Sequence, residues 1–291
     1  MTIPFFLVDA FTNRPFAGNP AGVCIVPEAA PARWMQSVAR EVGASETAFV
    51  IAPKDGRARL RWFTPTDEVD LCGHATLAAA HALRTHRDGT SAPEPDAVVF
   101  DTASGALTAQ YTNAGIRLNF PVDAPRPADP PAGLVAACNI PTPVWSGRSA
   151  RDWLLHVPTP QDVEAAAPAM DALSQFDTRG VILTAEGSTA DNHDFVSRFF
   201  APRVGVPEDP VTGSAHCALG PYWRDRLGRS DLTGYQASSR GGTVRIHLPE
   251  PAPSGARIHL LGACCTMVQG MWQAPPNATN PDAAAPQSPS L

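Results

Sequence analysis

Apolar and polar positions alternate or recur at helical spacing along most of the 291-residue chain, which predicts strands and helices in a mixed order. In the first half we expect strands over 5–11, 22–26, 46–51, 58–63, 97–101, 106–111 and 115–120, with helices after Pro31 and over 73–84. In the second half we expect strands near 152–157, 180–185, 194–200, 242–248 and 256–262, with helices after Thr159 and over 213–226. The second half therefore repeats the order of the first.

The repeat is also visible in the residues themselves. Arg61-Trp62-Phe63-Thr64-Pro65 precedes Cys72-Gly73-His74-Ala75 in the first half. Arg198-Phe199-Phe200-Ala201-Pro202 precedes Thr212-Gly213-Ser214-Ala215 in the second. Each half thus places a small, glycine-containing turn between a pair of strands and a helix. The shared order and the shared motif together indicate an internal duplication.

The length and the 44% content of hydrophobic residues suit two domains better than one. We place an N-terminal half-repeat domain at 1–125 and a C-terminal half-repeat domain at 126–273. The proline-rich segment 121–145 is interpreted as the connection between them. Residues 274–291, rich in proline and alanine, are expected to form a disordered tail.

Charge and cysteine content exclude several classes of protein. The formal net charge is −6 and no Lys/Arg-rich run occurs, so we expect no nucleic-acid partner. No apolar stretch approaches the length of a membrane helix, and the first residues lack the basic region of a signal peptide. None of the six cysteines forms a CxxC pair, so we expect no metal site and reduced thiols in the cytoplasm.

The two glycine turns have the properties of an anion site. The first turn of a helix carries unpaired N–H groups and partial positive charge, and a glycine there lets a ligand approach the backbone. Two such helix ends at one cleft would bind a carboxylate and stabilise an enolate. For a single turn, a purely structural glycine is the simpler interpretation. The repetition at Gly73 and Gly213 favours a site.

Three titratable residues lie beside these turns or at a strand end. Glu46 has small or apolar neighbours, and a buried carboxylate has a raised pKa that suits a general base. Taken alone, the local pattern favours a solvated strand-end residue for Glu46, and it is consistent with a turn residue before Pro210 for Asp209 and a helix-start residue bonded to backbone for His74. The placement of His74 and Asp209 beside the repeated turns favours a catalytic interpretation.

Two thiols facing each other could also serve as acid and base in a racemase. Cys72 is suitably placed at its turn, but the equivalent position of the second half is Thr212. Cys217 lies inside the following helix, where packing is its expected role. A two-thiol racemase is therefore disfavoured.

Four segments identify a family resemblance. They are Phe16–Val23 (FAGNPAGV), Ser45–Phe49 (SETAF), Cys72–Thr76 (CGHAT) and Glu208–His216 (EDPVTGSAH). With them the chain closely resembles the PhzF-like isomerases. The resemblance implies the α+β, diaminopimelate-epimerase-like fold, in which two pseudo-symmetric domains each wrap a mixed β-sheet around a central helix. It also implies a homodimer, and a last strand that returns to the first domain.

The resemblance further implies a reaction and a set of residues. The phenazine enzyme isomerises dihydro-3-hydroxyanthranilate by moving a proton along the ring, without a cofactor or metal. By this resemblance Glu46 shuttles the proton and three other residues assist catalysis: His74, Asp209 and Ser214. The substrate-binding residues are then Asn19, Ser45, Gly73, Thr212 and Gly213. The Cys-Gly-His form of the first turn differs from the form expected in the phenazine enzyme, so the substrate stays open.

The leading hypothesis is thus a cofactor-independent isomerase that moves a proton on a small carboxylate-bearing substrate in an interdomain cleft. One alternative is an epimerase or racemase of a small amino or hydroxy acid, with Glu46 and a second acid on opposite faces of one carbon. Another is a catalytically silent protein that binds a small molecule.

Overall fold

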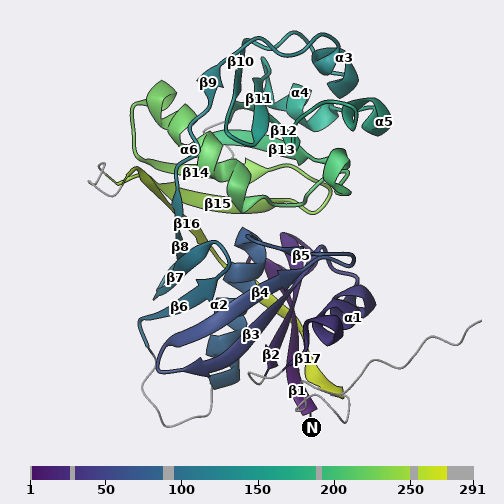
Figure 1. Cartoon of the computed structure of the whole chain (residues 1–291). Helices are drawn as coiled ribbons and strands as arrows, with labels where there is room; N and C mark the ends of the chain where they lie inside the picture. The colour runs from purple at the N-terminus through teal and green to yellow at the C-terminus, as the bar shows by residue number, and fades with distance from the viewer. Residues whose placement is uncertain (1, 27–29, 88–94, 188–191, 250–254, 274–291) are drawn as a thin grey trace, which may run out of the picture.

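The computed structural model describes residues 2–26, 30–87, 95–187, 192–249 and 255–273, which form two lobes joined by strands (Figure 1). The tail predicted at 274–291 lies outside the described residues. Within the described ranges, no helix combines the length and the apolar character that crossing a membrane requires.

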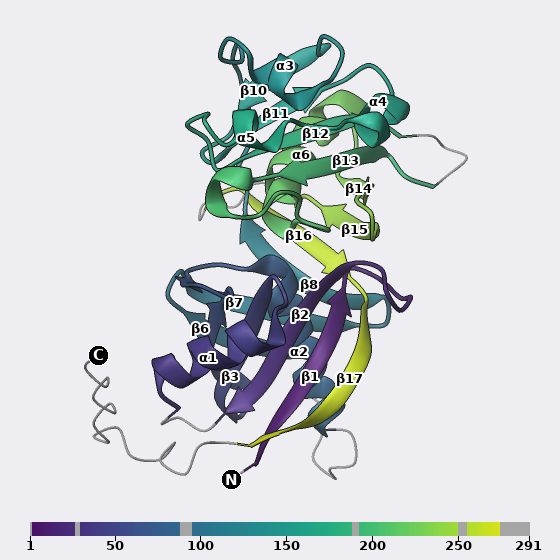
Figure 2. The ribbon, with the colours of Figure 1, turned by 90° about the vertical axis from the view of Figure 1, so that its right-hand side faces the viewer.

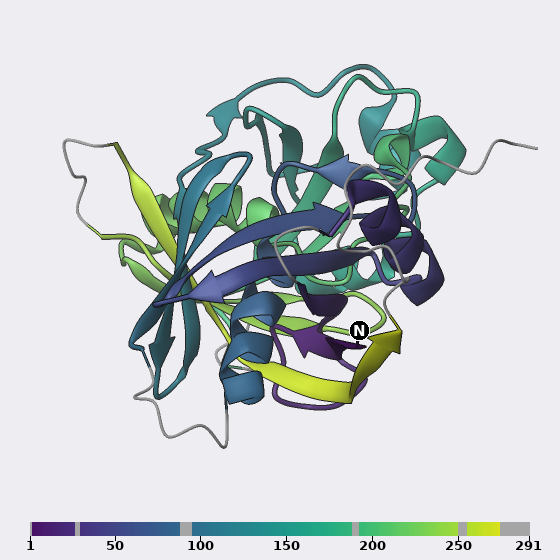
Figure 3. The same cartoon turned by 60° about the horizontal axis from the view of Figure 1, so that its bottom comes forward.

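The N-terminal lobe wraps a sheet around one helix. Its elements are β1 (Thr2–Ala10), β2 (Asn19–Val26), α1 (Ala32–Val42), β3 (Glu46–Lys54), β4 (Arg57–Phe63), β5 (Glu68–Val69), α2 (Gly73–Arg87), β6 (Ala97–Thr102), β7 (Gly105–Thr112) and β8 (Gly115–Pro121). The helix α2 carries alanine and leucine on nearly all sides, and these side chains are buried. A helix that is apolar all round requires cover on every side, which the curved sheet provides (Figure 3).

The C-terminal lobe repeats this arrangement around a second helix. Its elements are β9 (Arg126–Pro127), α3 (Leu134–Cys138), β10 (Trp145–Arg148), β11 (Asp152–His156), α4 (Pro160–Ala165), α5 (Met170–Leu173), β12 (Gly180–Glu186), β13 (Phe195–Phe200), η2 (Pro202–Val204), α6 (Gly213–Leu227), β14 (Asp231–Gln236), β15 (Gly242–His247) and β16 (Arg257–Gly262). Most side chains of the central helix α6 are buried. As predicted, Thr159 caps α4. Its hydroxyl accepts from the backbone N–H of Asp162, and its own backbone N–H donates to the Asp162 carboxylate.

Two strands tie the lobes together. β8 of the N-terminal lobe pairs antiparallel with β16 of the C-terminal lobe. β17 (Cys264–Gln273) follows β16 and pairs antiparallel with β1, so the chain returns to the N-terminal lobe (Figure 2). The described strands thereby form one connected sheet. The predicted fold class is confirmed: two similar halves each place a mixed sheet around a central helix.

Strand register shows which positions of the halves are equivalent. Phe63 and Phe200 are the third residues of the repeated motifs and end β4 and β13, and they pair with Thr47 and Val181 respectively. The residues just before these partners are therefore equivalent. Glu46 corresponds to Gly180, and Ser45 corresponds to Arg179.

One expectation from the sequence needs correction, and two strands were missed by the hydrophobic pattern. The segment 121–145 is more than a connection, because its helix α3 buries Leu134 and Cys138 in a core with β11 and β12. The pattern predicted neither β14 nor β17, although the family resemblance implied a last strand in the first domain. In β14 the inward residues are Leu232, Gly234 and Gln236, so the alternation expected of a half-buried strand is hidden.

Candidate functional site

The two glycine turns meet at the junction of the lobes. A Cβ atom added to Gly73 would lie 3.4 Å from the Cα of Gly213, and one added to Gly213 would lie 3.5 Å from the Cα of Gly73. The rings of Phe120 and Phe11 lie within 4 Å of these positions. The structure therefore brings together the two helix N-termini that the sequence analysis singled out. Side chains at either position would occupy the space next to the backbone N–H groups.

Glu46 begins β3 beside this junction. Its side chain is 17% exposed, and its Oε2 lies 3.2 Å from the Nε2 of His74. The contact is close but poorly aligned, and among the described residues Oε2 has no partner with hydrogen-bond geometry. Burial raises the pKa of Glu46, and hydrogen bonds with Ser45 and Cys72 oppose that rise. Glu46 therefore has a largely buried carboxylate with few hydrogen-bond donors to stabilise its anionic form.

His74 is buried and neutral. Burial lowers its pKa, against the opposing charge of Asp209. Its Nδ1 lies 3.1 Å from the Nδ2 of Asn19, an amide nitrogen that can only donate, and 3.5 Å from the Sγ of Cys72. Nδ1 is therefore the acceptor, and we assign the imidazole proton to Nε2, which faces Glu46 and Ser45.

Asp209 is held by three polar neighbours. The hydroxyl of Thr212 donates to its Oδ2 at 2.5 Å, and the amide of Asn19 donates to its Oδ1 at 2.7 Å. The side chain of Gln236 donates to the carbonyl of Asp209 and accepts from the backbone N–H of Thr212. Burial raises the pKa of Asp209, and the neighbouring His74 opposes the rise. Gln236 was not predicted, because it lies in the strand β14 that the pattern concealed.

Asn19, which was predicted to bind substrate, lies inside the junction of the lobes and not at its exposed surface. Its side chain is fully buried, and Nδ2 also donates to the carbonyl of Val211. It therefore links His74 in one lobe to Asp209 in the other. Five predicted residues keep partial exposure at the junction: Ser45, Glu46, Gly73, Asp209 and Ser214.

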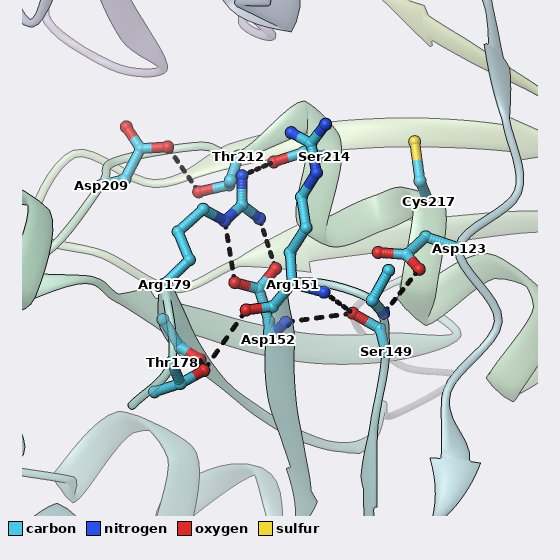
Figure 4. Close-up of polar contacts among 12 residues, drawn as sticks. Asp123, Ser149, Arg151, Asp152, Thr178, Arg179, Asp209, Thr212, Ser214 and Cys217 are labelled. Carbon is cyan, nitrogen blue, oxygen red and sulfur yellow. Dashed lines mark hydrogen bonds and ion pairs between the residues drawn. The ribbon is translucent and has the colours of Figure 1, made fainter. Parts of the chain in front are cut away.

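Ser214 is the predicted residue whose side chain follows a separate network. Its Oγ accepts a hydrogen bond from the Nη1 of Arg179 at 3.0 Å. Arg179 in turn binds the buried carboxylate of Asp152 through Nε and Nη2 (Figure 4). Local sequence gives no signal for Arg179, because the contact depends on the position of β12 beside α6.

One group of described side chains has ligand atoms close enough to share a metal ion. The donor atoms of Glu46, Cys72 and His74 all lie within 4.8 Å of one another. This mixed set of oxygen, sulfur and nitrogen donors would suit a zinc-like ion. Burial and the charge of Glu46 raise the pKa of the Cys72 thiol, so a metal would first have to displace its proton.

Two cavities lie away from the predicted site. Within the described part of the chain, cavities of about 500 and 270 Å³ are lined by residues of β14, β15 and β16 and by the 11–14 loop with its neighbours. Neither includes Glu46, His74 or Asp209. Since Gly73 and Gly213 touch, a substrate between them requires the lobes to move apart.

The chain is similar in sequence and in fold to several known proteins. The family model described as phenazine biosynthesis-like protein matches residues 8–270. A Halalkalibacterium halodurans protein named as an uncharacterized isomerase is 46% identical over 270 residues, which cover 92% of this chain and 98% of that protein. The crystal structure of a PhzF-family protein from Enterococcus faecalis matches with a TM-score of 0.84 at 34% identity, over 94% of this chain and all of that one. A hydroxyproline epimerase from Agrobacterium vitis shares the fold, with a TM-score of 0.56 at 12% identity over 93% of this chain and 92% of that one.

Proposed function

The chain belongs to the phenazine biosynthesis-like family, and from this premise we propose that it is an isomerase that moves a proton between carbons of a small carboxylate-bearing substrate. The proposed proton carrier is Glu46. The observation that carries the proposal is the state of its carboxylate, which is largely buried and faces a neutral imidazole, and whose Oε2 lacks a well-aligned partner among the described residues. Such a group accepts a proton readily and returns it near neutral pH.

The proposed reaction breaks one C–H bond and forms another. The carboxylate of Glu46 takes the proton, and the electron pair left on carbon passes into an adjacent carbonyl or double bond as an enolate. The protonated Glu46, whose proton exchanges with solvent through its exposed part, then protonates a different carbon, and the double bond shifts. Atoms and electrons balance without an oxidant or reductant. His74 donates its Nε2 proton toward Glu46 and so orients the carboxylate.

The negative charge that develops in this step faces the beginnings of α2 and α6. Their first-turn N–H groups carry partial positive charge, and those of Gly73 and Gly213 are the groups we propose to bind the substrate's carboxylate or carbonyl. Because both residues lack a Cβ, a ligand atom reaches the backbone directly. Asp209, whose pKa is raised by burial, is proposed to hold a second proton at the opposite lobe.

The test is proton exchange in D₂O. Purified protein is incubated with a panel of small unsaturated and amino carboxylates, including dihydro-3-hydroxyanthranilate, and deuterium at carbon is followed by NMR. The proposal predicts exchange with the wild type and a loss of at least about 10³-fold with Glu46→Gln, which keeps the shape but removes the base. Glu41→Gln, at an exposed glutamate of α1, is the matched control and should exchange normally. Full exchange by Glu46→Gln would overturn the assignment.

The same spectra separate the alternatives. An epimerase puts solvent deuterium at the carbon from which the proton was taken, and Asp209 is the second acid that such an enzyme would use. An isomerase shifts the double bond and places the proton on another carbon. A ligand that binds without exchange of any carbon-bound proton would instead support a silent binding protein.

A further inference from the structure

Two arginines lie at the edge of the C-terminal lobe that faces the start of α6. Arg151 directly precedes β11 and Arg179 directly precedes β12. These strands run parallel, with Asp152 paired to Gly180, so the two arginines are neighbours on one sheet edge. Figure 4 shows both side chains extending toward Thr212 and Ser214, where α6 begins.

Arg179 is fixed by a buried carboxylate. Its Nε donates to the Oδ1 of Asp152 at 2.8 Å, and its Nη2 donates to Oδ2 of the same residue. Asp152 is 1% exposed at its side chain, whereas Arg179 is 28% exposed. The carboxylate therefore sets the plane of the guanidinium and leaves its Nη1 edge turned to Ser214. A planar group held in this way is prepared to bind a carboxylate or similar anion.

Arg151 adds a second cation without a fixed partner. Its side chain is exposed, and among the described residues it makes no hydrogen bond or ion pair. Burial and the charge of Asp123 raise the pKa of the Cys217 thiol to about 12, and the charges of Arg179, Arg151 and Arg257 oppose this rise. Both guanidinium groups are thus close to the first turns of α6.

Each carboxylate around these cations accepts at least one hydrogen bond, although Asp123 has no cation paired with it among the described residues. Asp152 binds Arg179, Asp123 accepts from the backbone N–H of Ala150, and Asp209 accepts from Thr212 and Asn19. The side chain of Thr212, the residue before α6, makes no capping hydrogen bond. The exposed edge of the cluster therefore presents donors: two guanidinium groups, the Ser214 hydroxyl and first-turn N–H groups.

We propose that Arg151, Arg179 and Ser214 form a subsite for the carboxylate of the substrate. The proposal rests on the proposed function and deepens it by giving the substrate a direction. Its carboxylate lies toward the C-terminal lobe, its carbonyl is then the group bound at Gly73 and Gly213, and its reacting carbon lies toward Glu46 in the N-terminal lobe. The equivalence of Arg179 with Ser45 supports this direction, because the residue that flanks the base in one half is a cation in the other.

The test uses binding alone, so it stays valid if Glu46 proves not to carry a proton. Protein labelled with ¹⁵N-arginine is titrated with benzoate and, as a neutral match of the same shape, with benzamide. We expect benzoate to shift the Nε signals of Arg151 and Arg179 saturably below about 50 mM, with benzamide at least about tenfold weaker. Glu46→Gln should bind benzoate as the wild type does. Absence of a saturable shift, or equal shifts with benzamide, would overturn the subsite.

Variants separate binding from folding. Arg151→Gln changes an exposed side chain, so it should weaken benzoate about tenfold while the melting temperature stays unchanged. Arg179→Lys keeps the charge but loses the planar guanidinium with its paired donors. The double variant Arg179→Gln/Asp152→Asn replaces the ion pair by a neutral pair. Both should also weaken the binding of benzoate. Arg59→Gln, at an exposed arginine of β4, is the control. Wild-type affinity in Arg151→Gln and in the folded double variant would contradict the proposal.

Discussion

The beginnings of α2 and α6 are equivalent in the fold and different in chemistry. At α2 the neighbours are Glu46, His74 and Cys72, a set with a carboxylate and no cation among its members. At α6 the neighbours are Ser214, the cation Arg179 and the carboxylate of Asp209, which accepts from Thr212. The equivalent of Glu46 is Gly180, where a Cβ would come within 2.4 Å of the Phe199 ring, so no carboxylate fits there. One half therefore supplies the proposed base, while the other supplies a cation.

Substitutions of the two carboxyl groups, Glu46 and Asp209, should have the largest and most unequal effects on the rate of proton exchange. Glu46→Gln removes the only base of the α2 side that we assign, so exchange should fall by at least about 10³-fold. Asp209→Asn can still form hydrogen bonds with Thr212 and Asn19, but it loses the carboxylate charge, so the rate of exchange should fall by about tenfold. Rates are measured by deuterium incorporation with the substrate that the panel identifies. Equal losses would favour a two-base epimerase over a single proton carrier.

The repeated arginines give a comparison of stability. Arg198 is 13% exposed, binds Glu208 and donates to the carbonyls of Val163, Glu164 and Ala166, at the end of α4. Its equivalent Arg61 makes a single, more exposed pair with Glu68. Arg198→Gln should lower the free energy of unfolding by about 2–3 kcal/mol, since buried acceptors lose a charged donor. Arg61→Gln should cost less than about 1 kcal/mol. Urea unfolding measures both, and equal costs would refute the contrast.

The burial of Glu46 should be visible in stability as well as in rate. Its pKa is raised in the folded state, so the folded protein binds more protons there and stability is lost as pH rises above the ordinary glutamate value of about 4.3. Glu46→Gln should therefore be more stable than the wild type at pH 8, by about 1–3 kcal/mol. The gap should close below about pH 4. Glu41→Gln should show no such gap in thermal unfolding, and a destabilised Glu46→Gln at pH 8 would show that the carboxylate is well satisfied.

Much of the site could be predicted because its motifs are contiguous. The two glycine turns and the residues next to them, such as His74, are visible as a repeated pattern in the sequence. Arg179 could not be found in this way, because its equivalence with Ser45 appears through strand register and the two hairpins differ in length. Gln236 was hidden in β14, where two of the three inward residues are not apolar.

The fold was predicted in outline by the same logic. Strongly periodic strands and both central helices were placed within a few residues of their observed bounds. The hydrophobic pattern missed β17 because its residues are mostly half-buried or exposed and show no clear alternation. α3 is too short to show helical periodicity, although Leu134 is fully buried. Pairing across long sequence separations, such as β1 with β17, has no local signal.

The most direct test of the central claim is the pKa of Glu46 itself. Carboxyl ¹³C NMR of glutamate-labelled protein follows the titration, and the signal missing from Glu46→Gln assigns the residue. We predict that Glu46 titrates above the ordinary glutamate value of about 4.3, because burial disfavours its anion while His74 stays neutral beside it. A titration at or below that value would mean that the carboxylate is a stabilised anion, and it would contradict the role of Glu46 as the proton carrier.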